Sequence, residues 1–203
     1  MKSRSLSFMQ MTLAAMFVMA SVASLKVTHI GPLIIPAGVI LYALTKPLLD
    51  IITELWGGKV SQITVWYMAA VRTIVFAIMF VIYALPTVQQ TPGLSFVLLG
   101  SIWVFIAGVL SELAGMLLVD NPIFMKLNGK VSFLWKQILS DVSVFVSVGT
   151  FVLMYKLIFP ATKLLPMFIG QSVVTLFIAF CLAPIAVLVV RKINGTRQTP
   201  TTS

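Results

Sequence analysis

The sequence predicts an all-α integral membrane protein with six transmembrane helices, and both its composition and its hydropathy pattern indicate this class. Hydrophobic residues make up 60% of the 203 residues and charged residues only 9%, with a mean hydropathy of +1.08. These values exclude an ordinary soluble domain. Six apolar runs are long enough to cross a bilayer core of about 30 Å at about 1.5 Å per helical residue. The predicted spans are Phe8–Val27, Leu33–Trp56, Val60–Leu85, Ser95–Val119, Val131–Phe159 and Pro166–Val190.

The basic residues predict how this bundle is oriented. The formal charge is +9, but most Lys and Arg side chains stand at the ends of the apolar runs, so we interpret the charge as topology and not as a nucleic-acid surface. Eight of them fall on one side of the membrane and three on the other, which places both termini in the cytoplasm. We therefore expect one six-helix transmembrane domain over residues 1–193 and a short, polar, disordered cytoplasmic tail over residues 194–203.

Charged residues inside the predicted spans are the most informative feature. Lys46, Asp50 and Glu54 follow one another at i,i+4 spacing in the second span, although each ionisable group at membrane depth costs about 2.5–3.5 kcal/mol on insertion scales. Such groups should face one another or a wet cavity, which predicts a charge-lined interior pocket open to one side. The alternative is a set of structural ion pairs that fix helix register. The ionisable residues within the spans are Lys46, Asp50, Glu54, Arg72, Glu112, Lys136 and Asp141.

Two further patterns accompany these charges. Gln137 lies one turn before Asp141, which predicts a polar stripe on the fifth span. The tripeptide Ala-Gly-Val followed by an aspartate occurs twice at one spacing, from Ala37 to Asp50 and from Ala107 to Asp120. Both copies run in the same direction in this topology, so they are not counterparts in an inverted repeat. We interpret the echo as chance.

The sequence offers little support for catalysis. It contains no Gly-x-x-x-x-Gly-Lys-Ser/Thr phosphate-binding loop, one histidine, His29, and one cysteine, Cys181. A metalloprotease needs a cluster of metal ligands and a serine hydrolase needs an intramembrane base. We therefore expect no enzyme, no cofactor and no metal.

Three segments carry a family resemblance. The run from Pro36-Ala37-Gly38 through Asp50-x-x-x-Glu54-x-x-Gly57 resembles the signature of the vitamin-uptake-transporter family of queuosine precursor transporters. The resemblance continues in Ala107-Gly108-x-x-Ser111-Glu112 and in Trp135-Lys136-Gln137-x-x-Ser140-Asp141. It implies a bacterial inner-membrane protein that imports a 7-deazaguanine such as preQ0 or preQ1. It also implies a six-helix fold like that of the substrate-binding components of energy-coupling-factor transporters.

The resemblance suggests roles for the polar residues. A deazaguanine presents a ring N–H beside an exocyclic amine, and one carboxylate accepts both hydrogen bonds. Asp50, Glu54 or Asp141 is the expected carboxylate, with Asp50 and Glu54 first because they carry the sharpest motif. Arg72 or Gln137 would donate to the ring carbonyl, and Trp135 or Tyr42 would stack on the ring. The full set of candidate substrate-binding residues is Asp50, Glu54, Asp141, Arg72, Gln137, Glu112, Lys136, Lys46, Trp135 and Tyr42.

Alternatives to this function remain open. Glu112 replaces the glutamine usual in the family, and Lys46-Pro47 is also atypical, so the substrate of this chain could be a different small planar molecule. The chain could also be the binding component of an ATP-driven importer, but such components present an Ala-x-x-x-Ala face on the first helix. Here the first span offers Ala20-x-x-x-Ser24, near the wrong end. A scaffold protein without a ligand would show paired charges and no cavity.

Overall fold

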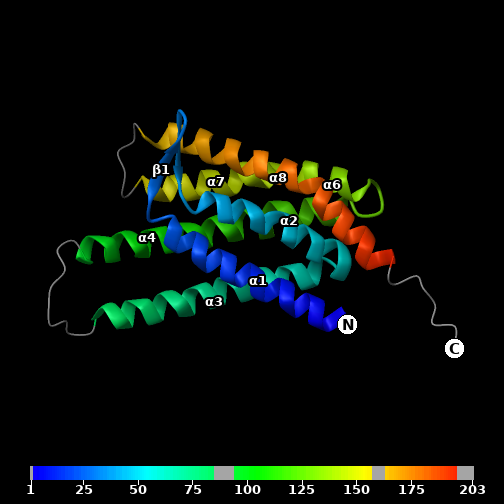
Figure 1. Ribbon diagram of the computed structural model, residues 1–203, viewed down its shortest axis with the longest axis horizontal. Helices are drawn as coiled ribbons and strands as arrows, with labels where there is room; N and C mark the ends of the chain where they lie inside the picture. Colours follow the sequence, from blue (N-terminus) through cyan, green and yellow to red (C-terminus); the bar gives the residue numbers. More distant parts are fainter. Residues whose placement is uncertain (1, 85–93, 157–162, 196–203) are drawn as a thin grey trace.

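The computed structural model describes residues 2–84, 94–156 and 163–195, and it is mostly helical (Figure 1). Its elements, in chain order, are α1 (Lys2–Ala23), β1 (Val27–Ile30), β2 (Leu33–Pro36), α2 (Val39–Trp56), α3 (Gly58–Ala84), α4 (Leu94–Glu112), the π-helix η1 (Leu113–Asp120), α5 (Asn121–Lys126), α6 (Phe133–Ser140), α7 (Val142–Tyr155) and α8 (Leu164–Gly195).

Five helical segments of the described chain are long and apolar enough to cross a membrane. They are Arg4–Ala23, Gly58–Ile82, Ile102–Lys126, Phe133–Met154 and Leu164–Ile193. These five support a multi-pass membrane protein. Helix α2 is not among them, because its 18 residues include three charged side chains. The second predicted span, Leu33–Trp56, therefore stays a prediction.

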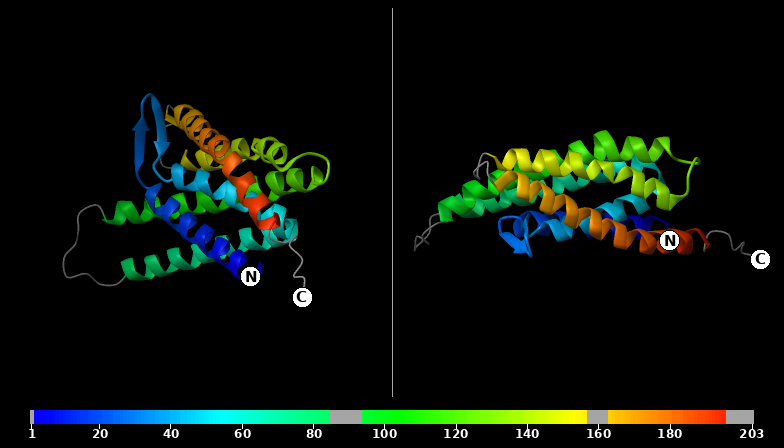
Figure 2. Two further views of the ribbon diagram at one scale, coloured as in Figure 1. Left: turned by 45° about the vertical axis from the view of Figure 1, so that its right-hand side comes forward. Right: turned by 90° about the horizontal axis from the view of Figure 1, so that it is seen from above.

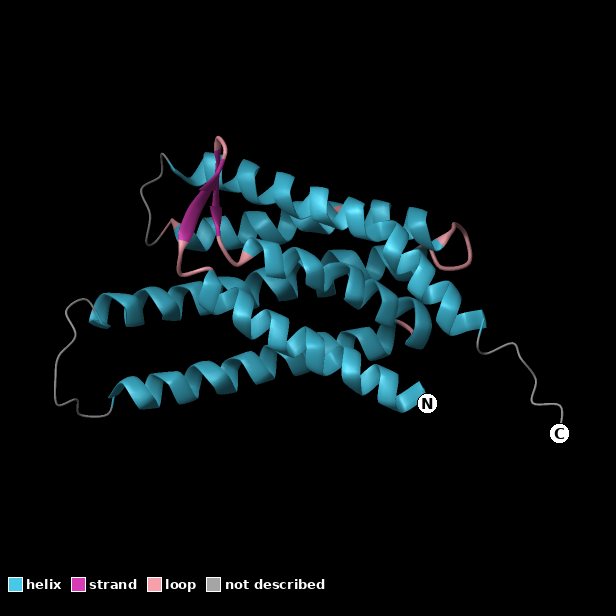
Figure 3. Ribbon diagram, viewed as in Figure 1, coloured by secondary structure: helices cyan, strands magenta, loops and turns pink. Residues whose placement is uncertain are grey.

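A β-hairpin occupies the place where the first predicted span was to end and the second to begin. β1 and β2 pair antiparallel, with Val27 opposite Pro36 and Ile30 opposite Leu33 (Figure 3). Gly31 adopts a φ of 58° at the turn, a conformation that only glycine enters without strain. The β-branched residues around this turn favour strands. The expectation of helix over 33–38 is wrong here, whereas the mostly helical structure is consistent with an all-α membrane protein.

Two other predicted spans are not single regular α-helices. The fourth continues from α4 through the π-helix η1 into α5. The fifth is divided at Asp141 into α6 and α7. Helix α8 extends to Gly195, so the first two residues of the predicted tail are helical. The rest of the tail and the predicted span ends Leu85 and Phe159 lie outside the described residues.

Helix α2 lies in the middle of the bundle, packed against α1, α3, α6 and α8. The hairpin stands at one end of the bundle, and the start of α1 and the end of α8 lie at the other (Figures 1 and 2). We call these the hairpin end and the terminal end. Large apolar side chains cover much of the outer surface, including Phe8, Leu118, Phe177 and Phe180, each more than 60% exposed. A surface of this kind suits contact with lipid.

Candidate functional site

Charged side chains from several helices meet inside the bundle, in three separate groups that we call together the ionic layer. The first is the Lys46 cluster, which consists of Lys46, Asp50, Asp120 and Asp141. The second is the Arg72–Glu112 pair, and the third is the Glu54–Lys136 pair.

The Lys46 cluster joins three carboxylates to one ammonium group. Lys46 Nζ lies 2.8 Å from Asp120 Oδ1, 3.1 Å from Asp141 Oδ1 and 3.5 Å from Asp50 Oδ2. It also donates a hydrogen bond of 3.0 Å to Ser140 Oγ, while Ser143 donates one of 3.2 Å to Asp120. Three aspartates and one lysine leave two formal negative charges unbalanced when all four groups are ionised.

The Arg72–Glu112 pair joins α3 to α4. Arg72 Nη1 lies 3.4 Å from Glu112 Oε2, and both side chains are buried. Arg72 Nε and Glu112 Oε1 have no hydrogen-bond partner in the described part of the chain. Gly108 makes room for this arginine, because a Cβ there would stand 2.1 Å from Arg72 Nη2.

The Glu54–Lys136 pair lies nearer the terminal end and joins α2 to α6. Lys136 Nζ donates hydrogen bonds to Glu54 and, at 3.2 Å, to Asn128 Oδ1. The same ammonium group stands 5.1 Å from the centre of the Phe124 ring. The ammonium group of Lys136 is thus engaged by Glu54, Asn128 and Phe124, which indicates a structural ion pair.

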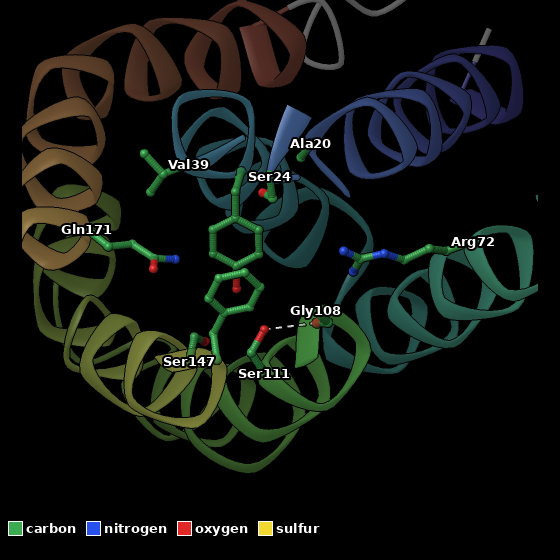
Figure 4. Close-up of a pocket in the computed structure, with 10 residues that line it drawn as sticks. Ala20, Ser24, Val39, Arg72, Gly108, Ser111, Ser147 and Gln171 are labelled. Atoms are coloured by element: carbon green, nitrogen blue, oxygen red, sulfur yellow. Dashed lines mark hydrogen bonds between the residues drawn. The ribbon is translucent and has the colours of Figure 1, made fainter. Parts of the chain in front are cut away.

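A small cavity lies beside the ionic layer, toward the hairpin end. Its volume is about 20 Å³, room for about one water molecule. Six helices contribute to its wall, and Figure 4 shows Arg72 and Gln171 extending toward the space from different sides. The lining residues are Ala20, Ser24, Val39, Tyr42, Arg72, Gly108, Ser111, Ser147, Phe151 and Gln171.

Polar atoms without partners border this cavity. Gln171 is 5% exposed and its Oε1 accepts no hydrogen bond from the described residues. Arg72 Nε likewise donates none. Because buried polar groups are nearly always hydrogen-bonded, an unused acceptor and an unused donor on one cavity suit a polar ligand.

The structure distributes the predicted site residues among several places. Tyr42 and Arg72 line the cavity, and Glu112 is paired with Arg72. Lys46, Asp50 and Asp141 belong to the Lys46 cluster, whereas Glu54 and Lys136 pair with each other. Gln137 is buried, and neither of its amide atoms is hydrogen-bonded to a residue that the structure describes. Trp135 is 56% exposed, so it does not line the interior.

The expected pocket lined by charges needs correction. The acids and bases do converge, but they contact one another, and among the cavity-lining residues that the structure describes only Arg72 is charged. Desolvated charges without counterions are so unfavourable that close pairing replaces an open charged chamber. The cavity lies next to that layer.

Asp120 was missed as an interior charge, because the predicted fourth span ended one residue earlier, at Val119. Its side chain is buried and makes the shortest contact to Lys46. The repeated Ala-Gly-Val and aspartate pattern could have indicated it. Both aspartates of that pattern, Asp50 and Asp120, contact Lys46 in the structure.

Residues 36–189 match the model of a family described as "Putative vitamin uptake transporter". The chain belongs to this family. Comparisons with curated proteins and with solved structures give no match. Within the described residues, no group of three or more His, Cys, Asp or Glu side chains is arranged to hold a metal ion. Membership in the transporter family implies a small-molecule substrate and a membrane location.

Proposed function

We propose that this member of the vitamin uptake transporter family is a secondary transporter that imports a 7-deazaguanine queuosine precursor, preQ0 or preQ1. Import would cross the bacterial inner membrane, with the terminal end of the bundle in the cytoplasm. The observation that carries this proposal is the small interior cavity, bordered by atoms of Arg72 and Gln171 that have no hydrogen-bond partner among the described residues. A scaffold protein has no need of such a cavity.

The Arg72–Glu112 pair supplies the hydrogen-bonding pattern that a deazaguanine requires. The ring carbonyl accepts from the guanidinium group, and the adjacent ring N–H and amine donate to a carboxylate. Glu112 contacts Arg72, which lines the cavity, and Glu112 Oε1 has no hydrogen-bond partner among the described residues. Asp50 and Glu54 stand in contact with lysines. The proposed site therefore uses Glu112 in place of the two carboxylates that the sequence motif favours.

Substrate entry requires movement of the cavity wall. A space of about 20 Å³ holds about one water molecule and not a bicyclic base. Separation of the helices toward the hairpin end would open the cavity to the outside, and separation toward the terminal end would open it to the cytoplasm. Such alternation is the ordinary cycle of a secondary transporter.

The first helix argues against an ATP-driven partner. Its small residues Ala20 and Ser24 line the cavity and are 4% and 8% exposed. A Cβ on Gly38 would stand 2.0 Å from the carbonyl oxygen of Ala20, so α1 and the start of α2 are already in close contact. This small-residue face is therefore covered within the chain and is not available to a coupling protein.

Binding and flux measurements on the purified full-length chain test the proposal. A ligand at 100 times its Kd adds about 2.7 kcal/mol to stability, so preQ0, preQ1, guanine and water-soluble vitamins can be ranked by thermal shift. Reconstitution of the chain alone in liposomes then tests whether preQ0 is transported without a partner. We expect a shift with preQ0 and transport by the chain alone. Transport that depends on an added ATPase would favour the binding-component alternative.

Two carboxylates provide a matched pair of variants. Glu112→Gln should lose most of its affinity for preQ0, because a neutral amide cannot accept both hydrogen bonds. Glu54→Gln should retain that affinity, because Glu54 pairs with Lys136 away from the cavity. The opposite result would place the site at the sequence motif and remove it from the cavity. Absence of binding to every compound in the screen would contradict the transport function.

A further inference from the structure

We propose that the Lys46 cluster binds a transported proton and couples import to the proton gradient. This inference rests on the proposed function, since a coupling proton has a role only in a transporter. The cluster is distinct from the substrate cavity, because none of its four members lines that cavity.

The charge balance of the cluster is the first argument. One ammonium group stands within 3.5 Å of a carboxylate oxygen from each of Asp50, Asp120 and Asp141. Side-chain exposures of 0% for Asp50, 4% for Asp120 and 14% for Asp141 leave little solvent to screen them. Several like charges in one buried site cannot all ionise without a large penalty. A bound proton on one carboxyl group removes part of the excess negative charge.

The hydrogen-bonding state of Asp50 is the second argument. Asp50 is completely buried, its Oδ2 points to Lys46 at 3.5 Å, and neither oxygen has a hydrogen-bond partner in the described chain. An ionised carboxylate in such a position lacks the donors that normally stabilise it. Gln137, one turn before Asp141, is also buried, and neither of its amide atoms has a hydrogen-bond partner among the described residues. A bound proton removes the charge of the carboxylate, which lowers the cost of burying it without donors.

The positions of the four residues connect the proton to backbone movement. Lys46 precedes Pro47 inside α2, Asp120 ends the π-helix η1, and Asp141 stands at the break between α6 and α7. Proline, π-helix and helix breaks are the usual places where helices bend. The ion pairs therefore join three points at which the backbone can change direction. Loading or losing a proton there changes the attraction that holds these points together.

The surrounding charges leave the cluster isolated. On α2 the next charge is Glu54, which is paired with Lys136 of α6. Arg72 of α3 and Glu112 of α4 pair with each other. Helix α8 has no charged residue between Leu164 and Val190, and the charges of α1 are confined to Lys2 and Arg4 at its start. Asp141 is the most exposed carboxylate of the cluster and offers the route by which a proton enters or leaves.

The proton itself can be observed without any substrate. Infrared spectroscopy of the purified full-length protein at neutral pH should show the carbonyl stretch of a protonated carboxylic acid, shifted in heavy water. Asp50→Asn should weaken this band, and Lys46→Met should strengthen it because a counterion is lost. Glu54→Gln is the control that should leave it unchanged, since Glu54 has its own lysine. A spectrum with no protonated carboxyl at neutral pH would overturn the proposal, and so would a band that Asp50→Asn and Asp120→Asn both leave intact.

Coupling is measured in liposomes that contain the protein alone, with preQ0 as the probe. A pH difference of one unit, acid outside, is worth about 1.4 kcal/mol and should raise accumulation about tenfold for one proton per substrate. A sodium gradient of the same size should have no effect. Exchange of preQ0 without gradient dependence, or dependence on sodium, would overturn the coupling while the proposed function stands. If preQ0 is neither bound nor exchanged, the proposed function fails, and the infrared result decides whether the cluster holds a proton.

Discussion

The cavity near the hairpin end and the Lys46 cluster both bury polar side chains, but they use them differently. Around the cavity, Arg72 and Gln171 keep hydrogen-bonding atoms unused and enclose a small space. In the cluster, the lysine contacts three carboxylates and Ser140 at 3.5 Å or less. The difference teaches that charge density alone does not locate a ligand site. Substitutions at the cluster should change stability most, whereas substitutions at the cavity should change affinity most.

The largest effect is expected from Lys46→Met. Loss of the ammonium group leaves three buried carboxylates without their counterion, and breaking a buried pair in this way costs about 3–5 kcal/mol. The midpoint of thermal unfolding in detergent should fall well below that of the natural protein. Lys59→Met is the matched control, because Lys59 is exposed and lies in the first turn of α3. Equal stability of the two variants would show that the cluster is not held together by Lys46.

Gly108→Ala tests the cavity through the contact of Gly108 with Arg72. The added methyl group would lie 2.1 Å from Arg72 Nη2, so the guanidinium group must move. Overpacking of this kind costs about 1–3 kcal/mol, and affinity for preQ0 should fall together with stability. If this variant bound preQ0 as tightly as the natural protein does, the position of Arg72 would not matter for recognition.

Gln171→Leu should separate affinity from stability. The Gln171 Oε1 atom accepts no hydrogen bond from the described chain, so its removal should change the free energy of unfolding by less than about 1 kcal/mol. Loss of one ligand hydrogen bond should weaken preQ0 binding by about tenfold to a hundredfold. Calorimetric titration and thermal unfolding of the same preparation provide the two values. A large loss of stability with unchanged affinity would show that Gln171 stabilises the fold and does not bind the ligand.

The smallest effect is expected from Gly149→Ala, which also serves as the control for Gly108→Ala. A Cβ at Gly149 meets its nearest atom, Phe168 Cε2, at an ordinary 3.7 Å. Replacing a glycine inside a helix by alanine should then stabilise the protein by about 0.5–1 kcal/mol. Destabilisation, measured by the same unfolding assay, would indicate that α7 needs its freedom to bend at this position.

The sequence predicted much of the membrane architecture, because long apolar runs leave few alternatives to helices. Five of the six predicted spans correspond to segments that are apolar and long enough to cross a bilayer. It missed the hairpin over 27–36, because hydropathy does not distinguish a short apolar strand from the end of a helix. It also missed the division of the fifth span at Asp141, because the apolar run itself contains no glycine or proline at this point.

The sequence predicted which charged residues lie in the interior better than it predicted which of them pair with each other. Interior charges had to find partners, and structural ion pairs of the kind given as the alternative are present, as between Arg72 and Glu112. The partner choices of Lys46 and Lys136 depend on how α2, η1 and α6 pack, and linear spacing does not specify that. The predicted pocket was expected among the charged residues, whereas the cavity lies beside them and is lined mainly by neutral residues such as Ser147 and Gln171.

The π-helix η1 makes the length of one short segment decisive. A π-turn holds an additional residue relative to an α-turn, so η1 turns less per residue than a regular α-helix. Deletion of Leu118, which is 75% exposed, would shift Asp120 relative to Lys46 and weaken their 2.8 Å contact. Related chains that are one residue shorter here would need a different acid opposite the lysine, or no lysine at all.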